Sequence, residues 1–86
     1  MGFAGWLGRI SNSDATLVKI IRDAGAVVYV RTNVPQSLMK VETDNHVYGV
    51  TVNPFNRTLT PGGSSGGEGA LMALKGRLVT IKGCAK

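Results

Sequence analysis

The residues best suited to chemistry lie in one short segment, Thr60 to Glu68, which reads TPGGSSGGE. It combines four glycines and two serine hydroxyls, and it leads into an apolar helical pattern. Glycine lets the backbone adopt positive φ and approach a ligand closely, and the amides that open a helix favour an anion or a developing oxyanion. The segment therefore favours acyl or phosphate chemistry. The alternative is a flexible Gly-Ser linker, although a linker does not normally run straight into an apolar helix.

Three well-known catalytic patterns fit this segment poorly. A phosphate-binding loop ends in Gly-Lys-Ser or Gly-Lys-Thr, whereas the segment continues as Gly-Glu-Gly. Ser64 and Ser65 lack the strand–turn–helix setting of the nucleophile elbow in α/β-hydrolases. A serine–histidine–acid triad is poorly supported as well, because His46 is the only histidine and a lone loop histidine is more often a surface or packing residue. The sequence thus argues against nucleotide hydrolysis and against a triad.

Length and composition predict one small packed domain. The 86 residues are 43% hydrophobic and carry a net charge of +5. The basic residues fall singly along the chain, so a solvated surface is favoured over a nucleic-acid face. Cys84 has no partner for an internal disulfide, which predicts a reducing compartment. No apolar run approaches the roughly 18 residues of a membrane span, and the N-terminus lacks a secretory signal, so we expect a soluble, cytoplasmic chain.

The first half of the chain has the pattern of an α/β unit. The cluster Ser11 to Asp14 is suited to cap a helix, and apolar residues then recur at helical spacing up to Gly25, which can end the helix. They are Leu17, Val18, Ile21 and Ala24. The next segment, residues 26–30 (AVVYV), is a short β-branched run typical of a strand covered on both faces. Helix, glycine and buried strand together predict an α/β fold.

The second half is less regular. Pro35 is well placed to open a short helix that runs through Met39. Residues 41–60 are predicted to form a loop with a short extended piece at 47–52, and such a long loop often carries a binding or active site. After the glycine-serine loop at 61–67, a helical pattern runs from Glu68 to Lys75. A four-residue strand follows at 78–81.

Two longer stretches give the chain a resemblance to a known family. DAGAVVYVRTNVPQ and TPGGSSGGEGAL resemble the amidase signature family, in particular its fungal amidase and fatty acid amide hydrolase branches. ETDN at 42–45 and NPFNR at 53–57 also fit the family's pattern, so the resemblance runs from about Gly2 to Gly76. It implies a fragment of an α/β fold in which helices flank a mixed sheet. Residues 1–76 would form a partial domain, and residues 77–86 a divergent C-terminal tail.

The resemblance also implies roles for individual residues. Members of the family hydrolyse carboxamides through an acyl-enzyme, using a lysine, a serine that follows a cis peptide bond and a nucleophilic serine, without metal or organic cofactor. By resemblance Ser64 is the cis serine, which passes a proton between the other two. Gly62, Gly63 and Ser65 would shape the loop. Leu38 and Met39 fall where the family lines its acyl pocket, although packing is the commoner role of such side chains.

Two of the three catalytic parts have no counterpart in the sequence. The family's lysine lies upstream of the GWLGR-like segment, and its nucleophilic serine lies downstream in a GTDIGGS-like segment that also forms the oxyanion hole. No residues here match either one, so we expect the 86 residues alone to be inactive. We also expect only marginal stability, because the predicted strand at 26–30 needs parallel neighbours that the rest of the family's sheet would contribute. A truncated or misassembled gene would explain the change of pattern at Arg77. The alternatives are a non-catalytic module that uses the loop as an anion or acyl pocket, or that associates with a full-length relative, and a basic nucleic-acid binder.

Overall fold

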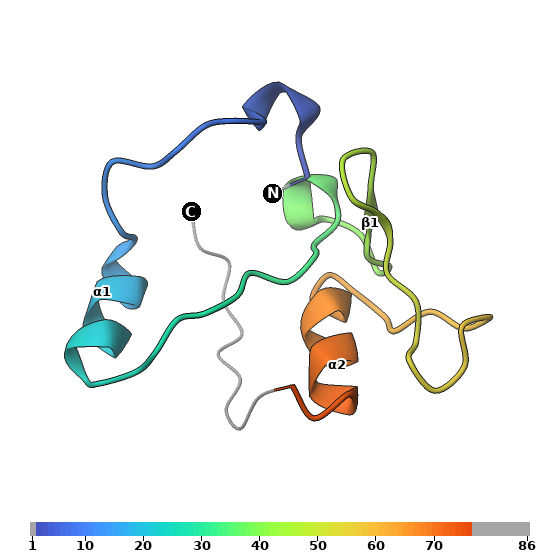
Figure 1. Ribbon diagram of the computed structural model, residues 1–86. Helices are drawn as coiled ribbons and strands as arrows, with labels where there is room; N and C mark the ends of the chain where they lie inside the picture. The colour runs from blue at the N-terminus through green and yellow to red at the C-terminus, as the bar shows by residue number, and fades with distance from the viewer. Residues whose placement is uncertain (1, 77–86) are drawn as a thin grey trace.

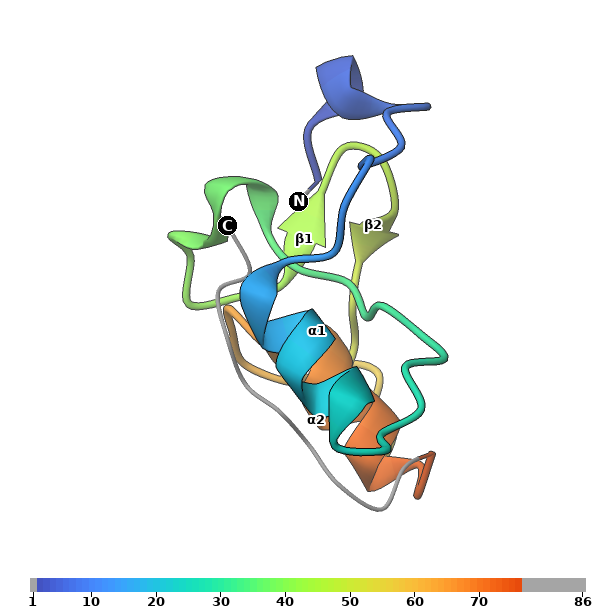
Figure 2. The same ribbon diagram turned by 90° about the vertical axis from the view of Figure 1, so that its left-hand side faces the viewer.

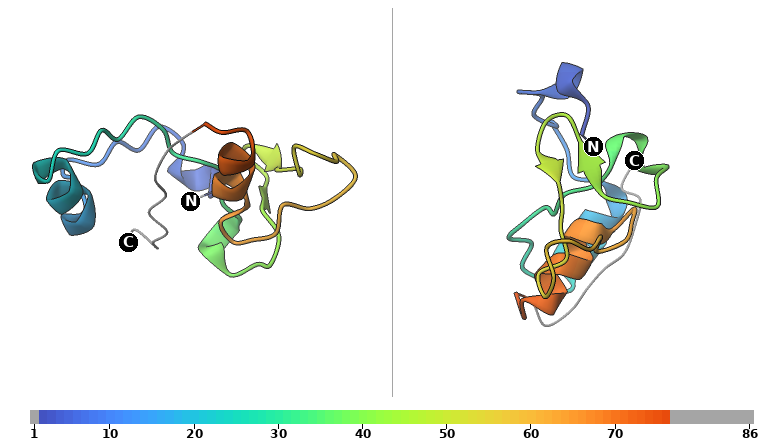
Figure 3. Two further views of the ribbon diagram at one scale, coloured as in Figure 1. Left: turned by 90° about the horizontal axis from the view of Figure 1, so that it is seen from below. Right: turned by 90° about the vertical axis from the view of Figure 1, so that its right-hand side faces the viewer.

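The computed structural model describes residues 2–76 of the chain, so the predicted strand at 78–81 lies outside the described residues. The described part contains two α-helices, α1 (Thr16–Asp23) and α2 (Gly66–Ala73), and two short strands, β1 (Asp44–Asn45) and β2 (Gly49–Val50). Two 3-10 turns, η1 (Ala4–Trp6) and η2 (Gln36–Leu38), complete the order. In Figure 1, α2 lies beside the β1–β2 hairpin and α1 lies on the opposite side of the molecule. Figure 3 shows the same separation of the helices from below.

Helix α1 confirms the helix predicted from the spacing of apolar residues, but the predicted N-terminal cap is wrong. The helix is preceded by Ala15, which offers no side-chain hydrogen bond, instead of a residue of the Ser11–Asp14 cluster. The Asp14 carboxylate instead pairs with the Arg22 guanidinium at 2.6 Å, which directs it toward the last turn of the helix. Gly25 follows α1 with a φ of +94°, the left-handed conformation expected after a helix end.

The predicted buried strand at 26–30 is not formed. The segment belongs to no strand, since the sheet within residues 2–76 consists of β1 and β2, and its side chains are exposed, Val27 at 84%. A strand requires neighbours that satisfy its backbone and cover its faces. The Tyr29 hydroxyl donates a hydrogen bond to the Gly76 carbonyl, which joins this segment to the end of α2. The prediction of a buried strand is therefore wrong for the described residues, because no neighbouring strand in residues 2–76 covers the faces of this segment.

The middle of the chain forms a small hairpin that the sequence predicted only in part. β1 and β2 pair antiparallel, with Asp44 opposite Val50 and Asn45 opposite Gly49 (Figure 2). β2 falls inside the extended piece predicted at 47–52, whereas β1 was assigned to loop. Nearby, the predicted helix from Pro35 to Met39 is reduced to η2. Positive φ at Ser37 and Leu38, 63° and 65°, prevents it from continuing as a helix.

The buried centre of residues 2–76 is polar. No Val, Leu, Ile, Met, Phe, Tyr or Trp side chain in this range is buried, whereas Thr43 is 1% exposed and Asn45 7%. Pro35 and the glycines at 2, 66 and 67 complete the buried set. α2 begins at Gly66, two residues before its predicted start, because glycines pack against this polar centre. Neither α-helix in the described range is long and apolar enough to cross a membrane.

Candidate active site

The glycine-serine loop is a tight turn that leads directly into α2. The Thr60 hydroxyl accepts a hydrogen bond from the Gly62 amide at 3.0 Å, and Gly62 itself has a φ of +80°. The peptide bond between Gly63 and Ser64 is cis. Ser65 then caps α2 through its backbone, without a side-chain hydrogen bond. The loop is thus defined at both ends, as a linker would not be.

Three positions in and after the loop admit no side chain. A Cβ on Gly63 would lie 2.6 Å from the Glu42 carbonyl oxygen, and a Cβ on Gly66 would lie 2.4 Å from the Thr43 hydroxyl. A Cβ on Gly67 would lie 2.4 Å from the backbone of Asn33. Contacts this short do not occur for real Cβ atoms, so these glycines let the loop and α2 approach two other segments of the chain.

The Thr43 hydroxyl joins the loop to the hairpin. It accepts a hydrogen bond from the Gly66 amide at 2.9 Å and donates to the Gly62 carbonyl at 3.0 Å, with the Ser64 carbonyl at 3.4 Å as a longer second acceptor. A hydroxyl has one hydrogen and two lone pairs, so the Gly62 and Gly66 contacts use both of its capacities. Because Thr43 is buried, no water replaces these bonds if the hydroxyl is removed.

Two asparagines extend this polar centre. The Asn45 amide group donates to the Asn33 side-chain oxygen at 2.6 Å and to the Val34 carbonyl at 2.8 Å. Its side-chain oxygen accepts from the amides of Val47 and Tyr48, which forms the turn of the hairpin. Asn33 in turn donates to the Thr51 hydroxyl and to the Gly49 carbonyl. Every polar atom of the two side chains has a partner, so the network joins the hairpin to the segment at 33–34.

Ser64 and Ser65, the two predicted site serines, are half-buried. The Ser64 hydroxyl makes no hydrogen bond to any other residue in the range 2–76, and no lysine ammonium there reaches it. Lys40 is instead paired with the Asp44 carboxylate at 2.5 Å. That hydrogen bond raises the pKa of Lys40 above its usual 10.5, and the charge of Glu42 raises it further. The described residues therefore supply the central hydroxyl of the predicted relay without the lysine.

The other predicted site residues are less closely tied to the loop. Leu38 is half-buried and Met39 is 89% exposed, so neither lines an enclosed apolar pocket within the described part of the chain. Their role in an acyl pocket stays a prediction. His46 is exposed in the turn of the hairpin. Within residues 2–76 no three His, Cys, Asp or Glu side chains come close enough to hold a metal ion.

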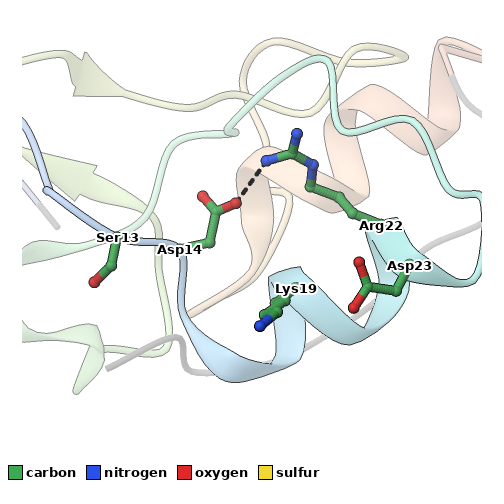
Figure 4. Close-up of a pocket in the computed structure, with 5 residues that line it drawn as sticks. All are labelled: Ser13, Asp14, Lys19, Arg22 and Asp23. Atoms are coloured by element: carbon green, nitrogen blue, oxygen red, sulfur yellow. Dashed lines mark hydrogen bonds and ion pairs between the residues drawn. The ribbon is translucent and has the colours of Figure 1, made fainter.

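A surface depression of about 420 Å³ lies over α1, away from the loop. Figure 4 shows its lining, which carries charges of both signs, and the ion pair between Asp14 and Arg22. The lining residues are Ser13, Asp14, Lys19, Arg22 and Asp23. Since α1 and α2 lie apart, this depression does not contribute to the environment of Ser64.

Sequence reasoning missed the three polar residues that hold the loop: Thr43, Asn33 and Asn45. Thr43 and Asn45 belong to the segment ETDN, which was noticed only as part of a family pattern and assigned to loop. Polar residues in a non-periodic stretch normally face water, so nothing in the spacing indicated burial. One signal could have revealed these residues, namely the need for hydrogen-bond partners. A closely packed glycine loop has backbone carbonyls and amides that a nearby hydroxyl or amide must satisfy.

Comparison with known proteins gives consistent results over nearly the whole chain. The family model described as Amidase matches residues 1–81. An amidase of Gibberella zeae is 54% identical over 67 residues, which are 78% of this chain and 12% of that protein. The acetamidase of Emericella nidulans is 47% identical over 81 residues, 94% of this chain and 15% of the acetamidase. Amidase 1 of Gibberella moniliformis is 46% identical over 79 residues, 92% of this chain and 15% of that protein.

The chain spans about one seventh of the length of the curated relatives that it matches. The matched region includes the glycine-serine loop and the segments that contain Thr43, Asn33 and Asn45.

Proposed function

Because the chain belongs to the amidase family, we propose that Ser64 is the middle member of a lysine–serine–serine relay that hydrolyses carboxamides through an acyl-enzyme. In this role the Ser64 hydroxyl takes the proton of the nucleophilic serine and gives its own to the lysine, so that a hydroxyl is activated without histidine. The substrate is a small carboxamide, and Gly62, Gly63 and Ser65 give the loop its shape. Leu38 and Met39 contribute to the acyl pocket.

The proposal rests mainly on one observation: the family match runs through a loop whose glycines are needed for close packing. Gly63 and Gly66, on either side of Ser64, lie against Glu42 and Thr43 with no room for a Cβ. The serine between them is half-buried, and its hydroxyl has no hydrogen-bond partner within the described residues. A linker serine would be solvated and its flanking glycines would tolerate side chains.

We further propose that the 86 residues alone do not complete the reaction. The lysine, the nucleophile and the oxyanion donors of the family have no match in this sequence. General acid–base catalysis contributes typically 10²–10⁴-fold, and loss of an oxyanion donor costs about 10²–10³-fold, so a single relay serine leaves little of the rate enhancement.

A chimera tests the role of Ser64. Residues 1–76 replace the aligned segment of the Emericella nidulans acetamidase, and hydrolysis of acetamide is measured for the chimera, for Ser64→Ala and for Ser13→Ala as a matched control. Ser13 lies just before α1 (Figure 4), and α1 lies on the opposite side of the molecule from α2, which the loop precedes (Figure 1). We expect Ser64→Ala to lower kcat by on the order of a hundredfold or more and Ser13→Ala to leave it unchanged. Equal activity of the two variants would contradict the relay role.

The same variants address the alternative of a non-catalytic anion or acyl pocket. In that case the 86-residue chain binds acetamide or acetate saturably without turnover, and Ser64→Ala weakens binding. In the relay, Ser64→Ala changes the rate and leaves ligand affinity nearly unchanged.

A further inference from the structure

The most deeply buried polar side chain of residues 2–76 has no part in the relay described above. Thr43 is 1% exposed, and its hydroxyl makes hydrogen bonds to the glycine-serine loop on both sides of Ser64. Burying a hydroxyl costs free energy unless its hydrogen bonds are made. A buried hydroxyl whose partners all lie in the candidate catalytic loop therefore calls for an explanation in terms of that loop.

The hydrogen bonds of the Thr43 hydroxyl lie on both sides of Ser64 in the sequence. The Gly62 carbonyl at 3.0 Å lies two residues before Ser64, and the Gly66 amide at 2.9 Å lies two residues after it. The carbonyl of Ser64 itself lies at 3.4 Å from the same oxygen. A single atom thus fixes the entry and the exit of a five-residue turn, which sets the direction of the bond from Cα to Cβ of the serine.

Thr43 is itself held by the hairpin. Its carbonyl accepts a hydrogen bond from the Thr51 amide at 2.9 Å, directly beyond β2, and the residue immediately precedes β1. The Thr43 side chain also has Gly66 in close contact, where a Cβ would lie 2.4 Å from the hydroxyl. Neither the hydroxyl nor the loop can shift without disturbing the other, so the hairpin determines where the loop lies.

We propose that Thr43 is a positioning residue for Ser64: its hydroxyl holds both ends of the glycine-serine turn and so directs the Ser64 hydroxyl. This inference rests on the proposed function, because the direction of the serine matters only if its hydroxyl transfers a proton. Thr43 does not touch the reacting atoms. It acts through the part-buried Gly62 carbonyl and the buried Gly66 amide, both of which lose this hydrogen-bond partner when the hydroxyl is removed.

The first test compares three variants in the isotope-labelled 86-residue chain. Thr43→Val keeps the shape and removes the hydroxyl, Thr43→Ser keeps the hydroxyl, and Thr51→Val is the control. The Thr51 hydroxyl accepts from Asn33 and does not contact the loop. We expect Thr43→Val to raise hydrogen exchange at the Gly66 amide about tenfold, the factor that corresponds to one lost hydrogen bond, and to shift the Ser64 Cβ resonance. Thr43→Ser should restore both signals, and Thr51→Val should change neither.

The second test uses the chimera and does not depend on the stability of the isolated chain. We expect Thr43→Val to lower kcat about tenfold with little change in KM, and Thr43→Ser to restore kcat. Equal losses in Thr43→Val and Thr51→Val, or unchanged kcat in Thr43→Val, would overturn the proposal. If Ser64→Ala keeps full activity, the proposed function fails instead. Hydrogen exchange at the Gly66 amide would then still show whether the Thr43 hydroxyl holds the loop.

Discussion

At the scale of single residues, the glycines of the loop differ sharply in what they tolerate. Gly66 lies against the Thr43 side chain, where a Cβ would be 2.4 Å from the hydroxyl oxygen. Gly69, one turn further along α2, is exposed. A Cβ added there would have the Pro61 carbonyl oxygen as its nearest neighbour, at 3.8 Å. The first glycine is required by packing, whereas the second is an ordinary helical position at which glycine is unfavourable.

This difference predicts opposite effects of the same substitution. Gly66→Ala forces the loop away from Thr43 and should lower the free energy of unfolding by about 1–3 kcal/mol. Gly69→Ala removes a glycine from a helix and should raise it by about 0.5–1 kcal/mol. Urea unfolding followed by circular dichroism measures both. A Gly66→Ala variant as stable as Gly69→Ala would show that the close contact of the loop with Thr43 is not formed.

At the scale of elements, the hairpin that carries Thr43 is reinforced by one ion pair. Lys40 and Asp44 side chains are 51% and 34% exposed, so solvent and salt weaken the interaction. The pKa of Lys40 is raised by its hydrogen bond to Asp44, and a raised pKa means that the folded state holds the proton more tightly than the unfolded state. The stabilisation is complete below the usual pKa of 10.5 and is lost as pH rises through the higher folded value.

Lys40→Met should therefore destabilise the chain slightly at pH 8, and the difference from the unsubstituted chain should shrink above pH 10.5. Comparing the two proteins at each pH cancels every effect of pH that both share. Unfolding midpoints in urea at pH 8 and at pH 11 measure the difference. A difference that grows with pH would have the wrong sign for this ion pair.

The elements also show which parts of the fold are encoded locally. The presence of α1 and α2 and the end of α1 at Gly25 follow from local patterns, since these signals act within a few residues. The α1 cap was predicted wrongly because Asp14 had a competing partner, Arg22, one helix length away. Whether residues 26–30 pair as a strand and whether Thr43 is buried depend on segments distant in sequence, so neither outcome can be read from a local pattern.

The candidate site was predictable to a similar degree. The TPGGSSGGE segment pointed to the loop, and the resemblance selected Ser64 within it. The residues that hold the loop were missed because hydrogen-bond partners from the hairpin cannot be read from glycine spacing. Asn33 and Asn45 are the plainest case: twelve residues separate them, and their amide groups are joined at 2.6 Å.

At the scale of the whole molecule, the described part of the chain has no buried hydrophobic side chains. Within residues 2–76 the apolar side chains that would normally form a core, such as those of Ile20 and Val28, are more than half exposed. The hydrogen bonds of Thr43, Asn33 and Asn45 are therefore the main interactions that hold residues 2–76 together. The free energy of unfolding expected from apolar burial is small.

This predicts fast hydrogen exchange at Val27, Val28 and Val30. The amides of these three residues donate no hydrogen bond within residues 2–76, in contrast to the Thr51 amide, which donates to the buried Thr43. Exchange of the three valine amides should approach the rate of an unstructured peptide, and the Thr51 amide should be slower. Slow exchange at all three valines in the monomeric chain would mean that this segment has found a strand partner.

The central claim concerns the rate of one chemical step, acylation, and it is tested most directly by single-turnover kinetics in the chimera. The rate of acyl-enzyme formation and the affinity for the amide are measured with and without Ser64→Ala. The relay predicts acylation slower by on the order of a hundredfold at nearly unchanged affinity. An unchanged acylation rate with weakened affinity would contradict it and assign the loop to ligand binding.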